Sequence, residues 1–215
     1  MLDEKSINAV RKIFSKHDYI MTTAELDSYR IYYADTQQLW NEGFIEKIKR
    51  GYYHWTEIYG EQEVKIINRL FPDAVLCMET ALFYYQYSDR NPAEWNITID
   101  KNISRSCTNI DYPFVKAYRA EPVLVPLGET KGSINFVDVR IYDRDRTICD
   151  VLRNMNKMDK EIFNKAIQGY VKDPKKNIPN LMEYAKVLRM QKRVKELIEL
   201  MWISCFAAFP IHWMR

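Results

Sequence analysis

Three carboxylates occur at positions where a small sheet could gather them: Glu79, Asp138 and Asp145. Asp138 lies inside an expected strand, and carboxylates grouped in this way hold the divalent cations of nucleases. A metal-dependent nuclease is therefore one hypothesis for this chain. The competing interpretation is structural, because a buried aspartate also accepts a hydrogen bond from a backbone amide or pairs with Arg140 or Arg144.

The other side chains able to bind metals or attack substrates are scattered. They are Cys77, Cys107, Cys149, Cys205, His17, His54 and His212. No CxxC pair occurs and no histidine lies beside a cysteine, so the spacing does not favour a zinc site. Cys149 falls within a helical segment, and we expect a packed thiol there and not a nucleophile. No phosphate loop, dinucleotide fingerprint, zinc-protease or nucleophile-elbow motif occurs. The sequence thus predicts no enzyme, no metal and no cofactor.

Positive charge is concentrated in the last third of the chain. Residues 150–215 hold 13 basic and 7 acidic side chains, a net charge of +6, whereas residues 1–60 and 61–149 carry −1 and −2. We define the basic face by Lys172, Lys175, Lys176, Lys186, Arg189, Lys192, Arg193 and Lys195. Such a surface attracts nucleic acid or an acidic protein, and the alternative interpretation is a solvated helical surface.

The first sixty residues show a pattern of short helices followed by a hairpin. Apolar periodicity predicts a first helix that ends near Lys16–Asp18, then a short extended run. Thr22 and Thr23 offer an N-cap for a short second helix. A third helix is expected over Ala34–Glu42, with Gly43 as its left-handed stop. The alternating segments 44–48 and 52–55 predict a hairpin. This order is typical of a winged helix-turn-helix.

In that arrangement the third helix enters the major groove and the hairpin turn lies against phosphates. The DNA contacts are then expected from Tyr33, Thr36, Gln37 and Gln38 on the helix, and from Lys47, Lys49 and Arg50 on the wing. We also expect Thr36, Leu39 and Trp40 to share one helix face. The alternative is a protein-docking module, since this helix carries no Arg or Lys.

Two segments carry a resemblance to a known family. Residues 22–26 with 38–53, which end in "E-G-F-I-E-K-I-K-R-G-Y-Y", resemble the N-terminal domain of AbiEi-type antitoxins of type IV toxin–antitoxin (abortive infection) systems. Residues 145–153, "D-R-T-I-C-D-V-L-R", resemble the "E-R-T-L-x-D-x-L-R" segment of the family's C-terminal domain. The order of elements agrees to about Trp202. The family's third helix often carries basic residues where this chain has Asp35, Gln37 and Gln38.

The resemblance implies two roles. The winged helix would repress its own operon by binding inverted repeats in double-stranded DNA. The C-terminal domain would oppose a nucleotidyltransferase toxin of the AbiEii type, without a stable complex. The basic face is then the expected antitoxin surface. A second hypothesis is a transcriptional repressor with a ligand- or protein-sensing C-terminal domain and no toxin partner.

The remaining pattern predicts an α+β chain. After the winged helix at 1–59 we expect a mixed α/β domain at 60–215. It comprises a small mixed sheet with helices (60–145), helices forming a basic bundle (146–202) and a tail of unknown role (203–215). Strands are expected at 74–76, 95–99, 114–118 and 134–142, with a hairpin-like loop at 128–132. The first bundle helix should bury Ile148, Val151, Leu152 and Met155.

The composition and the two terminal segments indicate the class of protein and the cell compartment in which it is expected. With 47% apolar and 28% charged residues, the chain is predicted to be globular and not disordered throughout. The polar, acidic start is unlike a signal peptide, so we expect a cytoplasmic protein. The apolar stretch 197–214 is interrupted by Glu199, Ser204, Pro210 and His212. We therefore expect a buried last helix and no membrane anchor.

Overall fold

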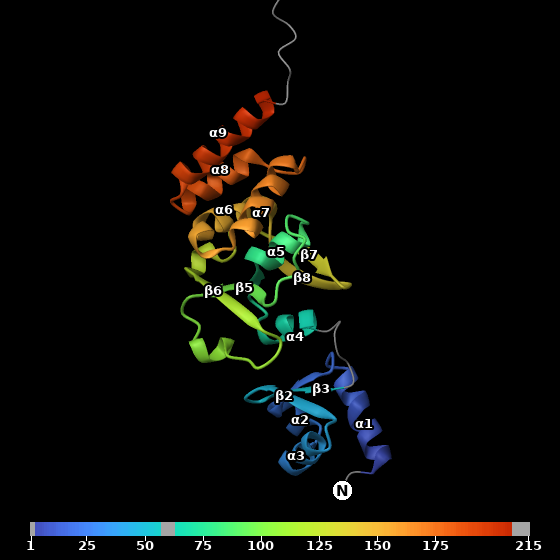
Figure 1. Ribbon diagram of the computed structural model, residues 1–215. Coiled ribbons are helices and arrows are strands. Elements are labelled where there is room, and N and C mark those ends of the chain that lie inside the picture. Colours follow the sequence, from blue (N-terminus) through green and yellow to red (C-terminus); the bar gives the residue numbers. More distant parts are fainter. Residues whose placement is uncertain (1–2, 57–62, 208–215) are drawn as a thin grey trace, which may run out of the picture.

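The computed structural model describes residues 3–56 and 63–207, the last eight of these as backbone alone. Figure 1 shows the elements stacked along one axis: the N-terminal residues at the foot, a second sheet in the middle and the helices α6 to α9 at the upper end. The predicted mixture of helices with small sheets is confirmed.

Residues 3–56 form three helices and a small antiparallel sheet in the order β1-β3-β2. The elements are α1 (Glu4–Ser15), β1 (Ile20–Thr22), α2 (Thr23–Ser28), α3 (Tyr33–Asn41), β2 (Ile45–Lys49) and β3 (Tyr52–Trp55). Each corresponds closely to an element expected from the periodicity of this segment.

Local side-chain chemistry explains the helix ends of this region. Asp3 caps α1 by accepting a hydrogen bond from the backbone of Ser6. Thr22 and Glu25 form a capping box at the start of α2. Gly43 follows α3 with φ +79°, the left-handed conformation that a glycine adopts without strain. The predicted stop of α3 is therefore confirmed.

The core beneath this sheet is apolar and aromatic. Phe14, Leu39, Ile45 and Trp55 are buried, and the rings of Phe14 and Trp55 lie 5.4 Å apart between centroids. The prediction that Trp40 shares the buried face is wrong, because its side chain is 45% exposed. It projects from the edge of the narrow stripe that Leu39 occupies, where a large ring cannot be fully covered.

The middle of the chain builds a second, mixed sheet. Its elements are α4 (Glu63–Leu70), β4 (Val75–Leu76), α5 (Met78–Tyr84), β5 (Trp95–Asp100), η1 (Arg105–Thr108), β6 (Val115–Ala120), η2 (Pro122–Leu124), β7 (Glu129–Ile134) and β8 (Val137–Tyr142). The strand order is β6-β5-β4-β8-β7. The pairs β5–β6 and β4–β8 are parallel, and the other neighbours are antiparallel. α4 packs Val64 and Ile67 in one apolar cluster with Ile97 and Ile141 of the sheet.

The predictions for residues 128–142 are wrong in part. Residues 129–132, expected within a hairpin-like loop, belong to β7. The single strand expected at 134–142 is interrupted by a two-residue turn, after which residues 137–142 form β8 as a strand. The turn residues Asn135 and Phe136 have φ of +50° and +62°. Such turns normally contain glycine, so Asn-Phe gives no turn signal in the sequence. Phe136 at this tip is fully exposed.

The upper end is helical, as expected. Its elements are α6 (Arg144–Asn154), η3 (Met155–Lys157), α7 (Lys160–Lys172), α8 (Ile178–Val187) and α9 (Gln191–Ala207). Ile148, Val151 and Leu152 are buried in the cluster that joins these helices. Met155 is 41% exposed, contrary to prediction, because α6 ends at Asn154 and the chain turns there. Of the expected tail, residues 208–215 lie outside the described part.

Residues 3–56 contact the rest of the chain mainly at α4, with a further backbone hydrogen bond from Asp111 to Ile48. Ile20 and Ile48 belong to the same apolar cluster as Ile66, and Arg69 forms an ion pair with Glu25. The predicted domain boundary at residue 59 falls in the segment 57–62, outside the described residues. Within the described ranges, no helix has the length and apolarity needed to cross a bilayer.

Candidate functional site

The outer surface of α3 is the first candidate site. Tyr33 is 76% exposed, Asn41 is exposed and Gln37 is half-buried. Figure 1 places α3 at the foot of the molecule, at the end away from α4. This surface is therefore open to a large partner.

Two of the predicted contacts on α3 are already engaged within the chain. Thr36 is 5% exposed and its hydroxyl donates to the carbonyl of Tyr32 at 3.1 Å. The prediction that Thr36 contacts DNA directly is therefore wrong, because its side chain faces the core. Gln38 donates its amide to Glu42 at 2.8 Å, so this amide must leave its intrahelical partner before it meets a base.

The predicted wing residues separate into two groups. Lys47 and Arg50 are exposed on the β2–β3 hairpin. Lys49 is half-buried, with its Nζ 4.5 Å from the ring centroid of Tyr52 and 5.5 Å from that of Phe71, directly after α4. Burial lowers the pKa of Lys49. Lys49 is therefore less available to a phosphate than predicted, because cation–π contacts hold it between the hairpin and the end of α4.

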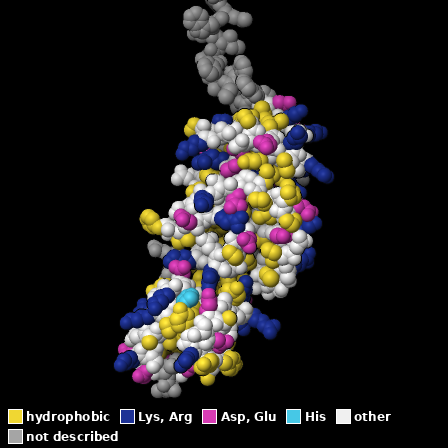
Figure 2. All heavy atoms as spheres, turned by 180° about the vertical axis from the view of Figure 1, so that it is seen from behind, with side chains coloured by type: hydrophobic (Ala, Val, Ile, Leu, Met, Phe, Trp, Pro, Cys, Tyr) yellow, Lys and Arg dark blue, Asp and Glu magenta, His cyan; other side chains and the backbone are white. Residues whose placement is uncertain are grey.

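The basic face is divided by α8. Lys172, Lys175 and Lys176 precede this helix, whereas Lys186, Arg189, Lys192, Arg193 and Lys195 lie at its end and on α9. A helix of ten residues is roughly 15 Å long. Figure 2 shows Lys and Arg side chains on both sides of the upper end of the molecule. We call these two groups, one before α8 and one at its end and on α9, the α7–α8 cluster and the α8–α9 cluster.

Two members of these clusters also bind backbone carbonyls. Lys176 donates from Nζ to the carbonyl of Asp173 at 3.0 Å. Arg193 donates from Nη1 to the carbonyls of Leu152 and Arg153, at 3.0 and 3.2 Å. Arg193 thus satisfies two carbonyls at the end of α6. Reversing the charge of Arg193 should therefore cost stability as well as surface charge.

The carboxylates that motivated the nuclease hypothesis are not brought together. Asp138 is exposed, whereas Asp145 is buried and accepts hydrogen bonds from the Tyr170 hydroxyl at 2.7 Å and the Asn177 backbone at 2.9 Å. No group of three potential metal ligands occurs among the described residues. Cys149 is buried, and burial raises the pKa of its thiol to about 12. The expected packed thiol at Cys149 is confirmed.

A polar stripe on α6 was not predicted from the sequence. Arg146 is 2% exposed and Asp150 is 8% exposed, and the two side chains form an ion pair of 3.3 Å. Arg146 also donates from Nη1 to the carbonyls of Leu124 and Leu127. Burial raises the pKa of Asp150, and the charge of Arg146 opposes that rise. The i, i+4 spacing of opposite charges in a core helix was the available signal.

A large open cavity of about 800 Å³ lies between α4, α5, β5 and the β7–β8 hairpin. Its walls carry the aromatic residues Phe83, Tyr84 and Trp95 and the carboxylates Glu63 and Glu94. Trp95 donates its indole N–H to Glu63 at 2.6 Å.

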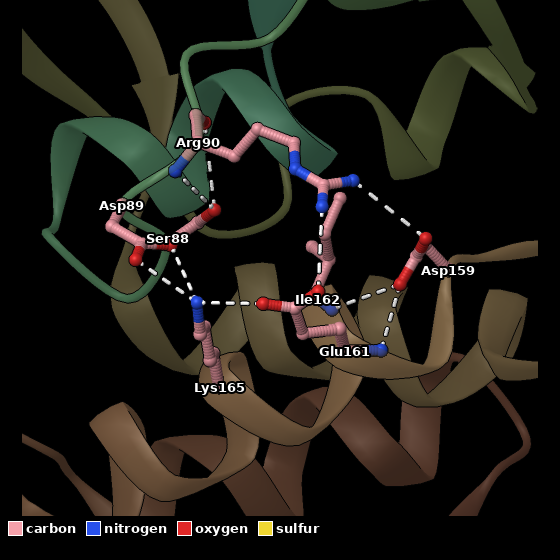
Figure 3. A network of polar contacts seen from close by, with 7 residues as sticks. All are labelled: Ser88, Asp89, Arg90, Asp159, Glu161, Ile162 and Lys165. Carbon is pink, nitrogen blue, oxygen red and sulfur yellow. Dashed lines mark hydrogen bonds and ion pairs between the residues drawn. The ribbon is translucent and has the colours of Figure 1, made fainter.

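Figure 3 shows how one rim of this cavity is fixed to α7. Lys165 bonds to Asp89 and to Glu161, in both cases at 2.9 Å. Arg90 pairs with Asp159 and Glu161, at 3.6 and 3.4 Å. Three of these exposed ion pairs therefore tie the loop after α5 to the helical end of the molecule, and the fourth, Lys165–Glu161, lies within α7.

No protein-family description matches the chain, and no curated protein is significantly similar to it.

Proposed function

We propose that residues 3–56 form a winged helix-turn-helix that binds the operator of its own operon. The observation that carries this proposal is the order of elements around the antiparallel sheet β1-β3-β2, with α3 facing outward. A helix in this position enters the major groove in proteins of this architecture. Tyr33 and Gln37 are then the residues on α3 best placed to meet DNA, with Lys47 and Arg50 neutralising phosphates.

We further propose that the rest of the chain is the antitoxin domain of a type IV toxin–antitoxin system. The support is the resemblance of residues 145–153 to AbiEi-type antitoxins, together with the two basic clusters. The partner is a nucleotidyltransferase toxin of the AbiEii type, opposed without a stable complex. The α8–α9 cluster is the stronger candidate surface, because four of its five side chains bond to no backbone carbonyl among the described contacts.

A gel-shift titration with the upstream region of the gene tests the DNA-binding half. We expect preference over a scrambled duplex of equal length, and weakening by salt. Arg50→Gln should reduce affinity for both duplexes, whereas Lys5→Gln on α1 is the matched control and should not. Equal binding to both duplexes, or none, would reject an operator-binding role.

Growth rescue tests the antitoxin half. Cells that express the adjacent toxin gene should grow when this chain is co-expressed. Lys192→Glu should weaken the rescue at unchanged protein level. Full rescue by a chain with Lys186, Arg189, Lys192 and Lys195 all changed to Glu would remove the α8–α9 cluster from the proposal.

The cavity of about 800 Å³ favours a second candidate function, a repressor whose C-terminal domain senses a small molecule. Its volume lies within the range of small-molecule sites. Operator binding without any growth rescue would select this alternative.

A further inference from the structure

One face of α6 is polar along its whole length. Arg146, Asp150, Arg153 and Asn154 follow the spacing i, i+4, i+7 and i+8, which places them on one side of the helix. Arg146 and Asp150 at one end are buried, and Arg153 at the other end is exposed. The opposite stripe of α6 packs in the apolar core.

This polar face borders a small cavity of about 180 Å³. Besides the four α6 residues, the cavity is lined by Met78, Thr98, Tyr118, Arg119 and Ala120. Thr98 on β5 is the register partner of Tyr118 on the parallel strand β6, and Arg119 and Ala120 end β6. The carboxyl ends of parallel strands are a frequent place for ligands in α/β folds.

The charge of the lining is unbalanced. Its three arginines face one carboxylate, and that carboxylate, Asp150, is paired with Arg146. Arg119 donates from Nη1 to the carbonyls of Ile103 and Lys101. Neither Arg119 nor Arg153 forms an ion pair with an acidic residue in the described part of the chain. The cavity lining therefore holds an excess of positive charge: three arginines face one carboxylate, Asp150, which interacts electrostatically with both Arg146 and Arg153.

We propose that this cavity binds a phosphate group, with Arg119 and Arg153 as its donors and the Arg146–Asp150 pair as its floor. The side-chain amide of Asn154 already donates to the carbonyl of Asp150 at 2.9 Å and to Sδ of Met78 at 3.7 Å. Guanidinium groups bind phosphate oxygens with paired, charge-assisted hydrogen bonds. The volume corresponds to roughly six water molecules. It is large enough for a phosphate group and too small for a whole nucleotide.

Positive charge continues outside the cavity, in the α8–α9 cluster. Arg193 bonds to the carbonyl of Arg153, so the α8–α9 cluster adjoins the cavity. When a ligand with several phosphates binds with one phosphate in the cavity, its other phosphates lie near the positive charge of the α8–α9 cluster. The shared chemistry is a phosphate group, either as the free anion or as part of a nucleoside phosphate.

Isothermal titration of the full chain at low salt tests this inference with three probes: inorganic phosphate, ATP and adenosine. We expect phosphate and ATP to bind and adenosine not to bind. Tighter binding of ATP than of phosphate identifies a nucleoside phosphate as the ligand, and equal binding identifies the free anion. Arg153→Gln should weaken binding about tenfold, the effect of one lost charge-assisted contact.

Lys157→Gln is the matched control, because Lys157 is exposed on η3 and does not line the cavity. Arg119→Gln provides a second test from the opposite wall. The inference is overturned if neither phosphate nor ATP binds, or if both arginine variants bind as the parent does. The gel shift on the operator does not depend on these titrations, so the two proposals can fail separately.

Discussion

The hydroxyl of Tyr170 on α7 donates a hydrogen bond of 2.7 Å to the carboxylate of Asp145 on α6, and both side chains are buried. Asp145 also accepts from the backbone of Asn177, at the start of α8. One carboxylate therefore joins three helices, and burial raises its pKa while these two donors oppose the rise.

Tyr170→Phe should lower the free energy of unfolding by about 1–3 kcal/mol, because a buried carboxylate loses one of its two donors. Urea denaturation measures the change. Tyr33→Phe is the control: its ring is 76% exposed, and its loss of a hydroxyl should leave stability unchanged. Equal stability of both variants would show that the Asp145 contact contributes nothing.

Gly128→Ala should destabilise the fold strongly. Gly128 has φ +76°, and a Cβ there would lie 2.9 Å from Cγ of Arg146 and closer still to its Cβ. We expect a loss of about 2–4 kcal/mol from strain and overpacking. Gly43→Ala is the matched control, because its φ is +79° with no atom within 4 Å of the added Cβ. It should cost about 1 kcal/mol in thermal or urea unfolding.

Glu129 accepts two hydrogen bonds of 2.7 Å from Arg140, on the paired strands β7 and β8. These bonds hold the pKa of Glu129 below its usual 4.5. The stabilisation is thus present above pH 4.5 and is lost as the pH falls through the lowered pKa. Glu129→Gln should cost about 0.5–1 kcal/mol at pH 7, since the pair is partly exposed. The difference from the parent should shrink in acid, and a constant difference would contradict the assignment.

Lys192 and Arg193 are adjacent basic residues with different roles. Arg193→Gln should lower stability by about 1 kcal/mol, because two carbonyls at the end of α6 lose their donor. Lys192→Gln should leave the unfolding free energy unchanged, since Lys192 is exposed. Only the Lys192 variant then reports on the surface charge alone in growth-rescue assays. Equal unfolding curves for the two variants would show that Arg193 does not stabilise the end of α6.

Gln37→Ala should weaken operator binding with little effect on stability, if α3 enters the groove. Thr36→Val should lower stability and spare operator binding, because the Thr36 hydroxyl donates a hydrogen bond within the helix. We expect it to cost about 1 kcal/mol of stability and to leave the affinity for DNA nearly unchanged. Gel shifts and denaturation on the same two variants separate these outcomes.

The sequence by itself determined the elements whose signals are local. The capping residues of α2, the glycine after α3 and the 3.6-residue periods of α6 to α9 depend on neighbouring side chains and backbone conformation, so they can be recognised without the fold. The β7–β8 turn could not be predicted from the sequence, because Asn135 and Phe136 adopt left-handed conformations that only the completed hairpin enforces.

Only the tertiary structure decided which polar residues face inward. Arg146 and Arg153 are seven residues apart on one helix, yet the first is buried against two carbonyls and the second is exposed. Lys49 turns to Phe71, and the basic residues of the last third separate around α8. Burial of a charge depends on partners distant in sequence, because desolvation is offset only by hydrogen bonds and counter-charges that folding brings together.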